Sequence, residues 1–133
     1  MLIGSNVLAS GNKLTVAGGA SSTFGVKLDN AVSDLQVLVK NSSGQIVNTL
    51  DLGAQAAGVV PVSGWTPVDS NGKTLADGTY TITATGTING QQATANTLSA
   101  SQVQSIVQMT DGTPGLKLAN GSTVALTSVA SIL

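Results

Sequence analysis

Apolar residues recur at every second position in short runs along this chain, and the runs are bounded by Gly, Asn, Asp or Pro. Such alternation puts the apolar side chains on one face of an extended segment, so the pattern predicts β-strands joined by turns. In residues 24–28, Phe24 and Leu28 lie on the face expected to point inward, and residues 35–40 repeat the pattern. Because no long amphipathic helical pattern occurs in the sequence, we predict an all-β fold.

Two β-hairpins are predicted from their turns. The turn from Asn41 to Gly44 directly follows residues 35–40, and its final glycine can adopt the positive φ that closes such a loop. Asn89-Gly90 is the strongest short hairpin signal in the chain and joins residues 79–87 to residues 91–99.

Other segments predict less regular structure. Residues 59–65 form a strand that contains Pro61, and because proline cannot donate a ladder hydrogen bond we expect this strand to lie at an edge or to be bulged. Beyond Ala100 the alternation restarts in shorter runs. Residues 127–133 have apolar positions at helical spacing, which predicts a single helical or 3₁₀ turn.

The spacing of the strands suggests a discontinuous organisation. Residues 21–99 contain about six or seven short strands at the spacing typical of a β-sandwich. Residues 1–20 and 100–133 are too short to fold alone. We expect these two ends to pair with each other as one small β-barrel that the sandwich interrupts.

The composition removes most catalytic chemistry. The sequence has no His, Cys, Arg or Glu, and all of its charge comes from five Lys and six Asp residues. Proton transfer near neutral pH usually relies on His or on a tuned Glu or Lys, and a Ser or Thr nucleophile needs a base beside it. Zinc, iron–sulfur and haem sites also lack their usual ligands. We therefore expect no enzyme activity and no cofactor. Of the metal sites only an oxygen-ligand site for a hard cation stays open, and none is predicted.

The charge and hydropathy of the chain narrow the classes of partner that it could bind. A net charge of −1 and a pI of about 4.8, without Arg or an aromatic stacking surface, argue against nucleic-acid binding. No apolar run approaches the roughly 20 residues of a membrane span, and residues 1–6 lack the basic region of a secretory signal. Four of the lysines form no run and are interpreted as solvated groups that protect strand edges, namely Lys27, Lys40, Lys73 and Lys117.

The densest cluster of turn-forming and aromatic residues lies between the two halves of the predicted sandwich. We interpret it as a structural motif, in which aspartates bond to backbone N–H groups, glycines supply unusual φ angles and the aromatic rings pack inward. Its members are Trp65, Asp69, Gly72, Leu75, Asp77, Gly78 and Tyr80.

Two kinds of chemical site are alternatives for this motif. A calcium loop beginning at Asp69 is disfavoured, because Lys73 occupies a ligand position and no Glu can close the site. A glycosidase pair of Asp69 and Asp77 is disfavoured because an aromatic-lined sugar cleft would have very few residues to draw on.

The order and spacing of several pieces resemble the flagellar hook-capping family, also called hook assembly or basal-body rod modification proteins. The resemblance runs over nearly the whole chain and ends in the motif just described. Its other pieces are Leu2-Ile3-Gly4, Val7-Leu8, Phe24-Gly25-Val26, Gly44-Gln45-Ile46-Val47, Thr49-Leu50-Asp51-Leu52-Gly53, Ala57-Gly58-Val59 and Leu116-Lys117-Leu118.

This resemblance implies a fold and a role. The fold would be a fibronectin-type-III or immunoglobulin-like β-sandwich inserted into a Tudor-like β-barrel made by both chain ends, with a further N-terminal segment in the whole protein. The role would be a non-catalytic scaffold that is exported by the flagellar type III route to the distal tip of the hook. There it would form a homo-oligomeric cap and guide hook protein subunits into place. The alternative from the residues alone is an extracellular carbohydrate-binding or adhesive module.

Overall fold

A computed structural model describes residues 2–133, and Met1, which the expected division assigns to the barrel, lies outside the described residues. All regular elements in the described part are β-strands apart from one 3₁₀ turn, which confirms the all-β prediction. The strands are β1 (Asn6–Ser10), β2 (Lys13–Ala17), β3 (Ala20–Ser21), β4 (Phe24–Leu28), β5 (Val32–Lys40), β6 (Ile46–Gln55), β7 (Gly58–Val62), β8 (Gly78–Ile88), β9 (Gln91–Gln108), β10 (Pro114–Leu118), β11 (Thr123–Ala125) and β12 (Val129–Ile132), with the 3₁₀ turn η1 (Leu126–Ser128) before the last strand.

The larger lobe is a sandwich of two antiparallel sheets. One sheet has the order β6-β5-β8-β2-β3, and the facing sheet is β7-β4-β9. Apolar residues from both sheets fill the space between them, including Phe24 and Val26 on one side and Leu35 and Ile82 on the other, all 0% exposed. Burying each such side chain contributes about 1.5–3 kcal/mol, so the alternation along the strands is what holds the two sheets together.

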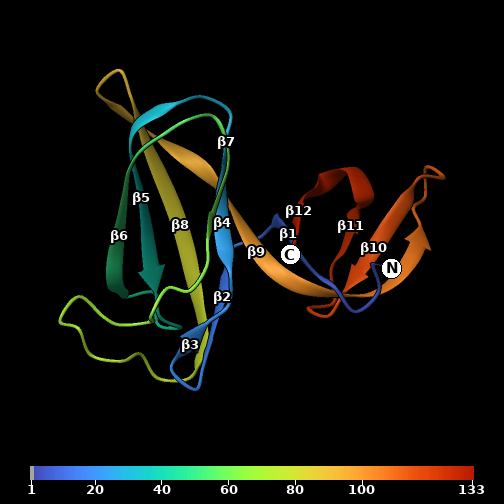
Figure 1. The fold of residues 1–133 in the computed structure, drawn as a ribbon, viewed down its shortest axis with the longest axis horizontal. Coiled ribbons are helices and arrows are strands. Elements are labelled where there is room, and N and C mark those ends of the chain that lie inside the picture. Colours follow the sequence, from blue (N-terminus) through green and yellow to red (C-terminus); the bar gives the residue numbers. More distant parts are fainter. Residues whose placement is uncertain (1) are drawn as a thin grey trace.

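The smaller lobe is a curved sheet around a second core. Its strand order is β11-β10-β9-β1-β12, and its core contains Val7, Val103, Leu116 and Leu118. Figure 1 shows this lobe beside the sandwich, with the two chain ends both lying in it. In this lobe β1, near one end of the chain, pairs with β12, near the other end.

A single strand connects the two lobes. β9 is 18 residues long, begins in the hairpin with β8 and ends against β10. At Ser99 it has neighbours on both edges, because Ser99 is opposite Phe24 of the sandwich and opposite Ala9 of the smaller lobe. Figure 1 shows β9 passing without interruption from one lobe into the other.

Both predicted hairpins are confirmed. The β5–β6 turn closes at Gly44 with a φ of 81°, and the β8–β9 turn has Asn89 at 52° and Gly90 at 78°. Two consecutive positive φ angles define the type I′ turn, which matches the right-handed twist of its flanking strands.

The strand that contains Pro61 is an edge strand, as predicted, but it is not bulged. β7 pairs only with β4 in an unbroken register and ends at Val62 rather than at Trp65. Pro61 lies opposite Gly25, and its backbone nitrogen is directed to the open side of the strand. Because no ladder hydrogen bond is made on that side, the lack of an N–H at Pro61 removes none.

Three strands depart from the expected boundaries. β2 pairs with β8, and its Leu14 and Val16 belong to the sandwich core, although residues 1–20 were expected in the terminal unit. β9 was expected to stop near Ser99 but continues to Gln108. Residues 129–132 form the strand β12 after η1 rather than continuing the turn. The common reason is that strand partners come from distant parts of the chain, which short-range periodicity does not record.

Candidate functional site

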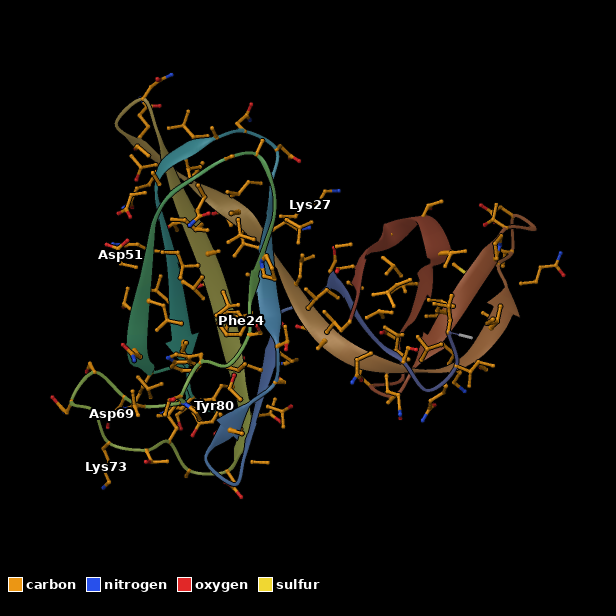
Figure 2. All side chains as sticks on the ribbon, viewed as in Figure 1. Phe24, Lys27, Asp51, Asp69, Lys73 and Tyr80 are labelled. Carbon is orange, nitrogen blue, oxygen red and sulfur yellow. The ribbon has the colours of Figure 1, made fainter. Side chains whose placement is uncertain are left out.

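The predicted motif spans the long loop between β7 and β8 and the first residues of β8, and the loop lies at the lower end of the sandwich in Figure 2. Trp65 packs edge-on against Phe24, with ring centroids 6.2 Å apart and an interplanar angle of 84°. The Tyr80 hydroxyl donates to the carbonyl oxygen of Ala76 at 2.7 Å, and Leu75 is buried. The aromatic and apolar members of the motif thus attach the loop to the core.

The aspartates of the motif bond to backbone groups. Asp69 Oδ1 accepts hydrogen bonds from the N–H groups of Asn71 and Lys73, both at 2.9 Å. Asp77 Oδ1 accepts one from Gly18 N–H at 3.0 Å and so connects the start of β8 to the β2–β3 turn. The two carboxylates act in different turns, and this arrangement is that of turn caps rather than of a paired acid and base.

The glycines of the motif occupy backbone conformations that favour glycine. Gly72 has a φ of 82° and follows Asn71 in the Asp69 turn, while Gly78 at 151° starts β8. Within residues 2–133 no group of three or more acidic side chains is close enough to hold a metal ion. In the same range, no helix has the length and apolarity to cross a membrane.

A carboxyl pair that the sequence did not indicate lies across β5 and β6. A hydrogen bond to the Asp51 carboxyl raises the pKa of Asp34, with desolvation and the Asp51 charge adding to the rise. The same hydrogen bond, together with the N–H of Gly53, lowers the pKa of Asp51. In Figure 2 Asp51 projects outward from β6, whereas Phe24 points between the sheets. The pair is therefore on the outer face of the larger sheet.

Two lysines meet at the other end of the same sheet. Thr81 of β8 has Lys13 of β2 opposite it on one side and Lys40 of β5 opposite it on the other. The two lysines line a shallow hollow of about 380 Å³ whose wall also contains Thr79 and Ser42. The sequence predicts Lys40 as an isolated edge charge, because only the strand register brings it near Lys13.

The junction of the two lobes carries a second hollow. It has a volume of about 450 Å³ and is lined by polar groups from both lobes, including Lys13, Thr23, Gln102 and Asn120. Neither hollow brings together a nucleophile, a base and an oxyanion donor in the manner of an active site. The described residues around these hollows form an extended polar surface rather than a catalytic pocket.

Comparison with known proteins decides the family. The family model of the FlgD Ig-like domain matches residues 11–90. The chain belongs to this family. The matched region begins before β2 and ends in the β8–β9 turn, so it covers most of the sandwich, including the whole β7–β8 loop.

Relatives and solved structures extend the similarity to the rest of the chain. The basal-body rod modification protein FlgD of Escherichia coli K12 is 28% identical over 133 residues. The crystal structure of FlgD from Pseudomonas aeruginosa has a TM-score of 0.76 at 29% identity and covers 100% of this chain and 98% of its own. FlgD from Xanthomonas campestris, described as giving insights into the hook capping essential for flagellar assembly, has a TM-score of 0.74 at 28% identity, with 99% and 94% covered.

The alignment with the curated relative covers all of this chain but only part of that relative. All of this chain aligns with the E. coli FlgD, but the aligned part spans 57% of that protein. The FlgD crystal structures, in contrast, correspond to this chain over nearly their full length. The sandwich and the smaller lobe together are thus the fold that the FlgD structures share.

Proposed function

We propose that this chain is the folded core of a flagellar hook-capping protein, a non-catalytic scaffold at the distal end of the growing hook that guides incoming hook subunits into place. The observation that carries the proposal is the match of residues 11–90 to the FlgD Ig-like domain, together with a fold that follows FlgD structures over the whole chain. The description of the Xanthomonas campestris structure names hook capping as essential for flagellar assembly, and the E. coli relative is named a basal-body rod modification protein.

The chemistry of the chain is consistent with a scaffold. A chain without His, Cys, Arg or Glu acts mainly through its shape and its polar surface. Its partners would be hook protein subunits and further copies of itself, with no role for nucleic acid or membrane insertion. Export by the flagellar type III route to the hook tip belongs to the same proposal.

The domain division is part of the proposal as well. The sandwich would correspond to the expected fibronectin-type-III-like domain of residues 21–99, extended by β2, and the smaller lobe to the Tudor-like barrel of the two ends. In the Trp65 to Tyr80 motif we propose a structural role, because its contacts are directed at the core and at its own backbone.

A chimera tests the function. The matching segment of E. coli FlgD would be replaced by this chain in a strain that lacks its own FlgD, and hooks would be counted by electron microscopy. We expect hooks to form with the chimera and to be absent when the segment is replaced by an unrelated immunoglobulin-like domain. Equal failure of both, with the chimera folded and secreted, would contradict the proposal. Glycan binding without hook-tip localisation would support the adhesive alternative.

A further inference from the structure

The outer face of the larger sheet is polar and built around a column of threonines. On β8 the residues that alternate with buried Tyr80, Ile82 and Ala84 are all threonine, and they point away from the core. We call this surface the threonine face. It comprises Thr79, Thr81, Thr83, Thr85 and Thr87 of β8, Asp34, Gln36, Leu38 and Lys40 of β5, Thr49 and Asp51 of β6, and Lys13 and Thr15 of β2.

One end of the threonine face is basic. Lys13 and Lys40 lie on either side of Thr81, so their Cα atoms are about 10 Å apart across two strand spacings. Neither ammonium group has a carboxylate partner among the described residues. At this separation salt screens most of their mutual repulsion, but together they form a positive end that attracts an anionic group.

The other end of the threonine face is acidic. Asp34 is opposite Thr87, and Asp51 on the next strand is opposite Gln36, which brings the two carboxyl groups together. Along β5 the distance from Asp34 to Lys40 is about 20 Å, six residues at about 3.3 Å each. The face therefore has two uncompensated positive charges at one end and a carboxyl pair at the other.

We infer that the threonine face binds the threonine face of a second copy of this chain in an antiparallel, two-fold arrangement. A two-fold axis that lies in the contact plane between the two faces, oblique to the strands and near Thr83 and Leu38, places each Lys13–Lys40 pair over the Asp34–Asp51 pair of the other copy. A single surface supplies both halves of the charge complementarity, and this is why a second copy fits it.

The contact is expected to be weak and reversible. Four strands at about 4.8 Å and a length of about 20 Å give about 400 Å² on each copy, roughly half of a standard stable interface. Short, branched threonine side chains lose little rotamer freedom on contact, which favours association through such a small area. The inference deepens the self-association in the proposed function and rests on it for its biological role.

The edges of this sandwich are poor alternatives for self-association. The open side of β7 lacks an N–H at Pro61, and the register of β6 on β5 shifts at several points. Both features disrupt the regular ladder that edge-to-edge pairing of strands requires. The threonine face, in contrast, carries groups of both charge signs that a second copy can match.

Charge reversal tests the inference. In sedimentation experiments on the 133-residue chain, the wild type should form a dimer at high concentration that dissociates as salt is raised. K13D/K40D and D34K/D51K should each self-associate at least about tenfold more weakly, because each makes the face uniformly charged. Mixing the two variants in equal amounts should restore a dimer. K27D/D29K exchanges charges outside this face and should behave as the wild type.

The possible results distinguish a wrong threonine-face contact from a wrong proposed function. A wild type that stays monomeric, reversed variants that associate normally, or a mixture that fails to recover the dimer would each overturn the threonine-face contact. Far-ultraviolet circular dichroism of each variant checks that the sandwich is intact. The FlgD chimera carrying K13D/K40D distinguishes this inference from the proposed function: normal hooks would overturn only the contact, whereas failure of the unmutated chimera concerns the function itself.

Discussion

The Ser99 side chain is bonded to both backbone groups of Lys13. Its hydroxyl donates to the Lys13 carbonyl oxygen at 2.9 Å and accepts from the Lys13 N–H at 2.9 Å, across 86 positions of sequence. Ser99 is also the residue at which β9 has one neighbour in each lobe, so this pair of bonds holds the start of β2 at the lobe junction.

Replacing Ser99 by alanine should therefore destabilise the chain. The variant leaves a backbone N–H and C=O of Lys13 without their partner in a part-buried site, which costs about 1–3 kcal/mol. Urea unfolding measures the loss. Ser101→Ala, two positions further along β9, removes a hydroxyl on the same strand and should cost less than about 0.5 kcal/mol; equal losses would contradict the role given to Ser99.

Gly25 on β4 should not tolerate a side chain. A Cβ at this position would lie 2.9 Å from the carbonyl oxygen of Val60 and 3.4 Å from the Cα of Pro61, both backbone atoms of β7. Gly25→Ala must displace the edge strand, and we expect a loss of about 1–3 kcal/mol in the free energy of unfolding. Lys27→Ala on the same strand is exposed and serves as the control; an unchanged midpoint for Gly25→Ala would show that β7 moves freely.

The β7–β8 loop provides its own spectroscopic reporter. Tyr80→Phe deletes the hydrogen bond to Ala76 and should cost about 1 kcal/mol while leaving the core packing intact. Trp65 is the only tryptophan, so its fluorescence reports whether the loop still packs against Phe24. We expect a lower unfolding midpoint with an unchanged native emission maximum. A red-shifted native spectrum would mean that the hydroxyl is needed to dock the loop.

The Asp34–Asp51 pair should make stability depend on pH in a defined direction. Because the folded-state pKa of Asp34 is raised, ionising it disfavours folding at neutral pH, and this cost disappears as the pH falls through the raised pKa. The lowered pKa of Asp51 has the opposite sign, since its stabilising contribution is lost as the pH falls through the folded-state value.

Asp34→Asn tests the destabilising effect of ionised Asp34 separately from the contribution of Asp51. The variant keeps a hydrogen-bond donor for Asp51 but removes the repelling charge, so it should be more stable than the wild type at pH 7. The difference should shrink on acidification toward the pKa of Asp34. Thermal unfolding at a series of pH values measures this, with Asp29→Asn as a control outside the pair. A variant less stable than the wild type at pH 7 would contradict the assigned direction.

Features of the fold that are encoded by neighbouring residues could be predicted from the sequence, whereas long-range pairings could not. The β5–β6 and β8–β9 hairpins could be predicted because Gly44 and Asn89-Gly90 encode their turns directly. The partnership of β2 with β8, and the length of β9, could not, because long-range pairing depends on which surfaces remain unburied after the local strands form.

The same limit applies to the surface. The motif from Trp65 to Tyr80 is nearly contiguous, and its turn chemistry was recognisable from spacing alone. Lys13 and Lys40 become neighbours only through the two strands that flank Thr81. Charge pairs made by strand register have no signature in a single sequence.

The most direct measurement for the account as a whole is the position of this chain on growing hooks. The FlgD chimera would carry an epitope in the exposed turn at Ser43, and gold-labelled antibody would locate it by electron microscopy. The account predicts label at the distal tip of incomplete hooks. Label along the hook shaft, or scattered over the cell surface, would contradict a capping scaffold.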